Sequence, residues 1–384
     1  MQEIYIVKAQ RTAIGNFLGS LSQIPAHILS AKLIEHMLQD VDKNLIDEVI
    51  LGQVLQGGVG QNSARQASVK AGIAFEKPAT TVNKVCGSGM KSIIFACDSI
   101  ASKRNHMVIA GGHENMSLAM HGSYLRQVLK YGNATQIDLI MKDGLSDAFS
   151  GNMMGVTAEN IAKKYNISRD AQDLFSLESQ IKARVARDSN YFANEIIAIE
   201  TSLGLFDRDE FIKDNSSIEK LAKLKPAFEA GGTVTAGNSS GINDGAAALL
   251  IASKDAVKAH KLVPIARIVS FASTGVDPEL MGTGPISAVN AALQRAGWTT
   301  SDLDLIESNE AFAAQAICVM NELKLDNAKV NICGGALALG HPIGASGARI
   351  VVTLIHQMKR IGAHKGLATL CVGGGMGVAM CIEV

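Results

Sequence analysis

The chain has 384 residues, of which 47% are hydrophobic and 19% charged, and its 36 basic residues balance its 36 acidic ones. A chain of this length usually forms two or three domains or one large layered fold, and the composition is typical of a compact protein without a disordered tail. The zero net charge excludes a global field that would attract nucleic acid or an anionic membrane, so we expect neither as a partner. Any anionic ligand must then be held by local cations or by helix N-termini.

Apolar runs alternate with amphipathic helical stretches along the first third of the chain. In chain order they predict strands at 4–7, 49–54, 80–85 and 108–110, with helices near 61–71 and over 87–103 between them. This alternation predicts an α/β fold with buried sheets.

The middle of the chain, about residues 115–242, carries more charge and longer connections. Its clearest element is a helix that begins after Ser168, a suitable N-cap, and that places the apolar residues Leu174, Leu177, Ile181 and Val185 on one face. We expect this stretch to be an insertion that lies over a cleft between two α/β halves and binds substrate there.

The last third repeats the order of the first. Strands are expected at 303–307, 330–333 and 367–372, and helices over 310–323 and after Gly344. Each half ends in a strand followed by a glycine turn, AGGHENM at 110–116 and CVGGGMG at 371–377, which indicates an internal duplication. The glycines of the second turn also interrupt the most apolar tract, which therefore predicts strand, tight turn and strand rather than a membrane span.

The six cysteines show no CxxC spacing, and the chain has no HExxH motif, so we expect no zinc site. No signal peptide precedes the first expected strand, and we therefore expect a cytoplasmic protein with reduced thiols.

Three glycine-rich motifs contain the reactive side chains, VCGSGMK around Cys86, GHPIGASGAR around His341 and CVGGGMG around Cys371. Cys86 follows an expected strand and begins an expected helix, whose dipole would favour the thiolate. His341 can take a proton from a thiol near neutral pH, and the pair points to acyl transfer through a thioester. A buried structural cysteine and a surface hydrogen-bonding histidine are the alternatives when each motif is taken alone.

Cys371 ends an expected strand and meets three glycines, whose N–H groups could form an oxyanion hole; a plain tight turn is the alternative. Asn309 in NEAFAAQ lies between an expected strand and an expected helix. Its amide could orient a water or a carbonyl, or it could be an ordinary helix N-cap.

At these four motifs the sequence resembles the thiolase family, in particular its biosynthetic acetoacetyl-CoA type. The similarity extends over essentially the whole chain, through RTAIGNFLGSL (11–21), IMKDGLSDAF (140–149), PAFEAGGTVTAGNSSGINDGAAA (226–248) and VDPELMGTGP (276–285). Four separated motifs in the family's order are far more specific than one short motif.

The resemblance implies a five-layered αβαβα fold of two duplicated halves with an inserted loop domain. The half that carries the nucleophile would comprise residues 1–115 and 243–267, and the half that carries the base residues would comprise 268–384. Residues 116–242 would form the loop domain for coenzyme A binding and tetramerisation. Residues 115–149, with SYLRQVLKYGN, resemble the family's tetramerisation loop and imply a homotetramer built as a pair of dimers.

The resemblance also implies a role for each motif. Cys86 would be acylated by the first acyl-CoA after activation by His341, and Cys371 would remove or return the α-proton of the bound acetyl-CoA. The enolate oxygen would face His341 and a water on Asn309, while the thioester oxygen on Cys86 would accept from the backbone N–H groups of Cys86 and Gly373.

A further set of residues is implied to lie along coenzyme A, namely Ser240, Phe228, Met154, Met281, Phe312 and Lys213 in a basic stretch. Without the resemblance, Phe228 and the methionines would be assigned to the core and Ser240 to a turn. Two positions depart from the family's usual residues. Met153 stands where a histidine is frequent and bears on pantetheine contacts and acyl selectivity, and Lys220 stands where a serine is frequent and would add a phosphate contact.

The sequence thus predicts an acetyl-CoA C-acetyltransferase that condenses two acetyl-CoA molecules to acetoacetyl-CoA and coenzyme A, without a metal or prosthetic group. A 3-ketoacyl-CoA thiolase of β-oxidation with a broader chain-length range is a close alternative, and a non-catalytic acyl-CoA-binding protein is an alternative of another class. A decarboxylating ketoacyl synthase, expected to use one cysteine and two histidines, is disfavoured by Asn309 and Cys371. The role of Cys333, beyond buried packing, stays open.

Overall fold

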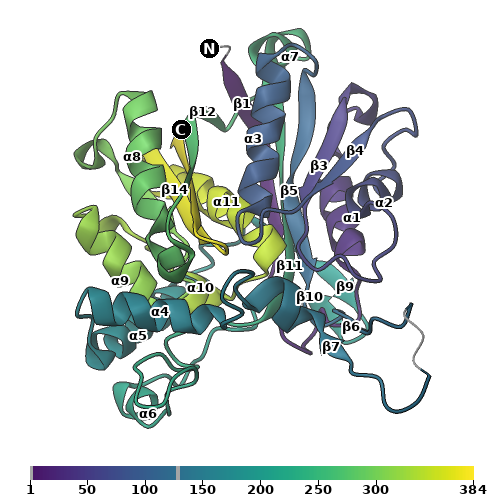
Figure 1. Ribbon diagram of the computed structural model, residues 1–384. Coiled ribbons are helices and arrows are strands. Elements are labelled where there is room, and N and C mark those ends of the chain that lie inside the picture. Colours follow the sequence, from purple (N-terminus) through teal and green to yellow (C-terminus); the bar gives the residue numbers. More distant parts are fainter. Residues whose placement is uncertain (1–2, 127–129) are drawn as a thin grey trace.

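The computed structural model describes residues 3–126 and 130–384, and it is built on one large mixed sheet (Figure 1). The strand order is β13-β14-β15-β12-β1-β11-β5-β3-β4. The strands of the N-terminal half are β1 (Ile4–Thr12), β3 (Glu48–Gly52), β4 (Ala79–Val82), β5 (Met107–Asn115) and β11 (Asn243–Ser253). Those of the C-terminal half are β12 (Ala266–Gly275), β13 (Leu305–Ser308), β14 (Lys365–Val372) and β15 (Met376–Glu383). Two short strands, β2 (Gly15–Asn16) and β8 (Ile196–Ile197), pair with β11 and β1.

The helices form layers on and between the two halves of this sheet. They are α1 (Ala26–Met37), α2 (Ser63–Lys70), α3 (Ser88–Ala101), α4 (Met154–Lys164), α5 (Arg169–Asp188), α6 (Ile218–Ala222), α7 (Lys254–Ala259), α8 (Gly284–Ala296), α9 (Ala313–Glu322), α10 (Ala336–Leu339) and α11 (Ile343–Ile361). None of the helices in the described ranges is long and apolar enough to cross a bilayer.

Three buried clusters define the layers. Helices α3 and α11 share one core with strands of both halves, in which Met90 and Ile350 join Leu249 and Leu370. A second core joins α1 and α2 to the N-terminal half, and a third joins α8 and α9 to the C-terminal half. The expected five-layered αβαβα arrangement is therefore confirmed, with α3 and α11 as its central layer (Figure 1).

The two halves repeat one topology, as the duplicated pattern of the sequence predicts. Strands β3 and β5 are parallel, and β5 continues antiparallel to β11 and β11 to β1. In the other half β13 and β14 are parallel, and β14 continues antiparallel to β15 and β15 to β12. The C-terminal glycine-rich tract forms the strand, turn and strand that were expected.

The strand expected at 330–333 is wrong beyond its first residue. Val330 forms a single bridge to Ile306, where β4 forms a full strand beside β3 in the other half. Asn331 then takes a φ of 45°, and its amide bonds the backbone N–H and carbonyl of Ser308 at 2.9 and 2.8 Å. These side-chain bonds take the place of a ladder and turn the chain away from the sheet.

Helix α5 begins at the expected cap, because Ser168 Oγ accepts from the N–H of Ala171 at 3.2 Å. Its apolar stripe nevertheless faces outward, with Leu174 and Val185 51% and 50% exposed. The helix packs against the rest of the protein through its small and amide side chains. For example, Nε2 of Gln180 donates to the carbonyl of Leu337 at 3.0 Å.

The inserted stretch between β5 and β11 contains α4, α5, α6 and a π-helical turn, Ile140–Leu145, and lies across one end of the two halves (Figure 1). Strand β6 (His121–Gly122) pairs with β7 (Ile137–Asp138) at the base of an extension. The SYLRQVLKYGN segment lies in this extension, and its residues 127–129 are outside the described residues.

A buried ionic cluster ties the inserted stretch to the N-terminal half. The guanidinium of Arg11, which is fully buried, donates to Glu195 at 2.7 Å and to both oxygens of Asp209 at 2.7 and 2.9 Å. Asp209 also accepts from the N–H of Ile14 at 2.8 Å. Since charges in such surroundings are stable only when paired, the cluster fixes both acidic residues against β1.

Removing one carboxylate of this cluster is expected to destabilise the protein strongly. Asp209→Ala leaves the Arg11 charge partly uncompensated, and we expect the free energy of unfolding to fall by about 3–5 kcal/mol in urea denaturation. Asp40→Ala is the matched control, because Asp40 pairs with Lys8 at the surface, where a pair contributes less than about 1 kcal/mol. Equal losses in the two variants would contradict the assignment.

Candidate active site

Cys86 lies in a strained turn between β4 and α3. The strand ends at Val82, earlier than expected, and Val85 takes a φ of 47°, which is rare for a β-branched residue. Its N–H donates to Asn83 Oδ1 at 2.9 Å, and its carbonyl accepts from Ser88 Oγ at 2.6 Å. These two hydrogen bonds hold Val85 in its unfavourable backbone conformation. Strained residues of this kind are typical of functional sites.

Helices α3 and α11 cross so closely that only glycine fits at the contact. A Cβ on Gly89 would lie 2.8 Å from the backbone nitrogen of Ala348, and one on Gly347 would lie 2.5 Å from that of Met90. The close approach brings the two segments that precede these helices, with Cys86 and His341, to the same cavity.

His341 is held by two bonds that also set its protonation. Its backbone N–H donates to Asn243 Oδ1 at 2.9 Å, and its Nδ1 lies 2.6 Å from Ser346 Oγ. Ser346 Oγ also lies 2.9 Å from the carbonyl of Pro342, and when its hydrogen is donated there, Nδ1 carries the imidazole proton. Nε2 has no partner among the described residues and can accept a proton. Burial, with a smaller contribution from Arg349, lowers the pKa of His341 to about 3, and the ring is therefore neutral.

The thiol of Cys86 is protonated in the resting protein. Burial raises the pKa of Cys86 to about 11, while the backbone N–H groups of Gly373 and of Cys86 itself act in the opposite direction. The expected thiolate at a helix start is wrong here, because α3 begins two residues later, at Ser88, and desolvation by the apolar surroundings dominates. A base must take the proton before the sulfur can attack a carbonyl.

Cys371 is the second-last residue of β14 and is almost fully buried in a cluster that includes Met281, Ala311 and Phe312. Burial first, and then the nearby Cys86, raise the pKa of Cys371. The site therefore combines two neutral thiols and one neutral imidazole.

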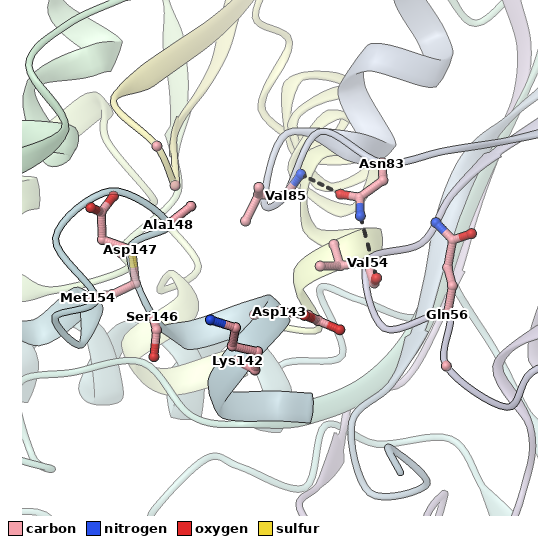
Figure 2. A pocket seen from close by; sticks show the side chains of 15 residues that line it. Val54, Gln56, Asn83, Val85, Lys142, Asp143, Ser146, Asp147, Ala148 and Met154 are labelled. Atoms are coloured by element: carbon pink, nitrogen blue, oxygen red, sulfur yellow. Dashed lines mark hydrogen bonds between the residues drawn. The ribbon is translucent and has the colours of Figure 1, made fainter. Parts of the chain in front are cut away.

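These side chains share an apolar cavity of about 470 Å³. Ten of the predicted site residues line it, namely Cys86, His341, Cys371, Gly373, Ser240, Phe228, Met154, Met281, Phe312 and Lys213. An apolar cavity with a few convergent polar groups is typical of a small-molecule site. A second cavity of about 690 Å³ lies beside the first and is lined by Asn83, Val85 and Lys142, as Figure 2 shows.

The inserted stretch closes the first cavity by contacts with the C-terminal half. The rings of Phe228 and Phe312 meet edge to face, with centroids 6.0 Å apart, and the N–H of Ser240 donates to the carbonyl of Ala311 at 3.0 Å. The wall next to Cys86 includes Met116, Leu145 and Ile343.

Two predicted site residues do not line the cavity. Asn309 is buried, and its backbone N–H donates to the carbonyl of Thr369 at 2.9 Å. Both amide atoms of its side chain lack a partner among the residues that the structure describes. A buried amide in this state fits a bound water or a ligand atom. It is not the N-cap of α9, because that position is Phe312. Lys220 is exposed on α6 and donates to the carbonyl of Asn215 at 2.6 Å.

Sequence reasoning missed Ser346, Asn243 and the wall residues. Ser346 lies in the quoted GHPIGASGAR motif, five residues after His341, so its spacing across a helix start was an available signal. Met116 and Leu145 come from separate segments and look like ordinary core residues in the sequence.

We expect Ser346→Ala to slow proton transfer from Cys86. Without the hydroxyl, Nδ1 loses its acceptor, so the imidazole proton can move to Nε2, and a buried group left unpaired lowers the rate about 10- to 100-fold. The measurement is the rate of Cys86 alkylation by iodoacetamide, followed by mass spectrometry. Ser92→Ala is the control, because Ser92 is a buried serine of α3 that bonds carbonyl groups only. A wild-type rate in Ser346→Ala would show that the hydroxyl does not set the base.

Comparison with known proteins gives a consistent result over the full chain. Residues 4–255 match the thiolase N-terminal domain and residues 262–384 the thiolase C-terminal domain. The chain is 53% identical to acetyl-CoA acetyltransferase of Chromobacterium violaceum, with 99% of each chain covered. It is 51% identical to acetyl-CoA acetyltransferase of Escherichia coli, with 100% of this chain and 99% of the relative covered.

Solved structures agree with these sequence matches. The crystal structure of Bacillus anthracis acetyl-CoA acetyltransferase superposes with a TM-score of 0.97 at 41% identity and covers 100% of this chain and 99% of its own. Human mitochondrial 3-ketoacyl-CoA thiolase in complex with CoA gives a TM-score of 0.97 at 40% identity and covers 100% and 98%. With both domains matched and relatives of this identity over its whole length, the chain belongs to the thiolase family.

Proposed function

We propose that this protein is an acetyl-CoA C-acetyltransferase, which condenses two acetyl-CoA molecules to acetoacetyl-CoA and coenzyme A and also catalyses the reverse thiolysis. The proposal rests on the observation that two thiols, of Cys86 and Cys371, line one apolar cavity together with the imidazole of His341. Nε2 of this imidazole has no partner among the described residues. One thiol and one base suffice for acyl transfer, whereas a Claisen condensation needs a further base for the α-proton.

In the first half-reaction, Nε2 of His341 takes the proton of Cys86, and the sulfur attacks the carbonyl carbon of the first acetyl-CoA. The bond to the sulfur of coenzyme A then breaks, and coenzyme A leaves with the proton that His341 held. The backbone N–H groups of Cys86 and Gly373, which already act on the sulfur in the resting protein, are placed to donate to the thioester oxygen.

In the second half-reaction, Cys371 first passes its proton to Nε2 of His341, which lines the same cavity. The thiolate of Cys371 then removes an α-proton from the second acetyl-CoA, and the resulting carbanion attacks the acetyl group on Cys86. The carbon–carbon bond forms as the acyl–sulfur bond of Cys86 breaks, and the sulfur of Cys86 takes back the proton that His341 held. His341 and a water on the unpartnered amide of Asn309 would face the enolate oxygen. Acetylated Cys86 carries no charge, so it does not oppose the ionisation of Cys371 as a Cys86 thiolate would.

The preference for a short acyl group is supported by the cavity and by the relatives. Met116, Leu145 and Ile343 pack in the same apolar cluster as Cys86 and would bound the acyl group carried by its sulfur. Both relatives that share about half of their residues with this chain are named acetyl-CoA acetyltransferase. The backbone does not separate the alternatives, since the 3-ketoacyl-CoA thiolase superposes equally well.

Coenzyme A is proposed to bind along Ser240, Phe228, Met154, Met281 and Phe312, with Lys213 and the exposed Lys220 near its phosphates. We also propose the division into 1–115 with 243–267, 116–242 and 268–384, since β11 joins the N-terminal half and β12 starts the second sheet half. Coenzyme A thioesters would be the reactants, with no metal or prosthetic group.

A cytoplasmic homotetramer that serves fatty acid metabolism is the proposed context. Assembly of subunits is supported by the extension after β6, where Tyr124 and Tyr131 are 85% and 98% exposed. Large apolar side chains on an extension of this kind are typical of a surface that another subunit covers.

The function is tested by thiolysis and by the separate half-reactions. We expect coenzyme A-dependent cleavage of acetoacetyl-CoA to exceed cleavage of longer 3-ketoacyl-CoAs, and Cys86→Ala to abolish both. Cys371→Ala should still become acetylated at Cys86 by acetyl-CoA, as seen by mass spectrometry, while condensation slows at least about 100-fold, because only the base for the α-proton is lost.

Other outcomes would identify the alternatives. Equal or greater rates on longer chains would assign the protein to the β-oxidation type. Binding of acetyl-CoA without acetylation or thiolysis in the wild-type protein would support the acyl-CoA-binding protein.

A further inference from the structure

Glu114, at the end of β5, is a fully buried carboxylate that accepts three backbone N–H groups from two distant segments. Its Oε2 accepts from Val54 at 3.0 Å and from Gly344 at 2.9 Å, and its Oε1 accepts from Leu55 at 3.2 Å. Such a carboxylate holds its donors in one arrangement, because each N–H would be costly to leave unpaired.

One donor belongs to the helix of the catalytic base. Gly344 is the second residue of α11, whose N-cap position, Pro342, provides no side-chain cap. Glu114 therefore supplies from the other half of the molecule the negative group that a helix N-terminus favours. The fit is close, since a Cβ on Gly344 would lie 2.7 Å from Oε2. Gly344 lies between His341 and Ser346, so this contact fixes the turn that sets the imidazole.

The other donors lead to the nucleophile. The carbonyl of Val54 accepts from Asn83 Nδ2 at 3.5 Å, and Asn83 Oδ1 accepts from the N–H of Val85, as Figure 2 shows. A path of backbone and side-chain bonds thus runs from α11 through Glu114, Val54 and Asn83 to the residue before Cys86.

We propose that Glu114 is a positioning residue of the reaction, whose carboxylate clamps the helix of His341 and the turn of Cys86 at the separation that proton transfer requires. The proposal deepens the proposed function and rests on it for the identity of the reaction. It concerns the ionised carboxylate, because only an acceptor without a hydrogen suits three converging N–H donors.

Protonation of Glu114 should therefore loosen the clamp. Burial raises the pKa of Glu114 to about 7, against the effect of its three backbone donors, and Asp244 of β11 raises it further. The titratable groups that face this site are Asp244, whose own pKa burial raises to about 6, and Cys86, which is a neutral thiol. Helix α11 and the segment after β3 present backbone N–H groups. Below pH of about 7 the carboxyl group of Glu114 is protonated, and its hydrogen points at N–H groups that are themselves donors. Glu114 must then lose one of its hydrogen bonds to the backbone, so we expect kcat to fall in this pH range.

The test is Glu114→Gln, which keeps the shape of the side chain and replaces one acceptor oxygen by an NH₂ group. We expect kcat for thiolysis of acetoacetyl-CoA to fall about 10- to 100-fold and KM to stay within about twofold, since the clamp does not line the substrate cavity. The decrease in kcat below pH of about 7 should be seen in the wild-type protein and be absent in the variant.

Glu159→Gln is the matched control. Glu159 is also buried and accepts the backbone N–H groups of Thr233 and Val234, but it touches neither catalytic turn. We expect it to lower the melting temperature about as much as Glu114→Gln and to leave the pH dependence of kcat unchanged. A wild-type kcat in Glu114→Gln, or a reduced kcat with the wild-type acidic limb, would overturn the proposal.

Two further measurements keep the test decisive. If Glu114→Gln does not fold, Asn83→Ala interrupts the same path from its other end and should lower kcat with little change in KM; an unchanged kcat would overturn the proposal. Alkylation of Cys86 by iodoacetamide needs no knowledge of the substrate and should slow in Glu114→Gln and Asn83→Ala. Absence of thiolysis in the wild-type protein would refute the proposed function alone, whereas unchanged alkylation in both variants would refute the role of Glu114.

Discussion

The close crossing of α3 and α11 is the contact on which the rest of the site depends. Each helix belongs to one half of the duplicated fold, and both lie in the layer between the two halves of the sheet (Figure 1). Because Gly89 and Gly347 let the two backbones nearly touch, the turn before α3 and the turn before α11 meet at one cavity. Duplication thus supplies a thiol from one half and an imidazole from the other, and the inserted stretch adds apolar side chains such as Met116 and Leu145 to the cavity that both line.

Desolvation governs the chemistry of these groups more than any single charge does. It raises the pKa of both thiols and lowers the pKa of His341, so the resting site carries no ionised reactive group. Oriented backbone N–H groups of Cys86 and Gly373 provide the fixed dipoles that replace water when negative charge develops. Reactivity is therefore held back until a substrate brings a carbonyl into the cavity, which protects two thiols that would otherwise be open to side reactions.

The sequence was sufficient for the features with a local signature. Glycine frames around Cys86, His341 and Cys371 marked the reactive residues, and the repeated order of strands and helices predicted the duplicated layers. The glycine turn expected at AGGHENM (110–116) is wrong, because β5 continues to Asn115. Glu114 of this strand has no local signature, since its donors are backbone groups up to 230 residues away. The strand at 330–333 failed because the side-chain bonds of Asn331 outweigh the strand tendency of its neighbours. The protonation of Cys86 depends on burial by segments far apart in the chain, which a local motif does not reveal.

Helix α11, whose N-terminus is capped by Glu114 of the other half, affects how the protein folds during synthesis. This helix follows every strand of the N-terminal half in the chain, and before it is synthesised the inner face of that sheet half has α3 but not α11 to cover it. The nascent chain must therefore expose apolar residues such as Leu249 until α11 has been made. Premature termination before residue 343 would leave that surface without its cover, so incomplete chains should be prone to aggregation and become substrates for chaperones and proteases.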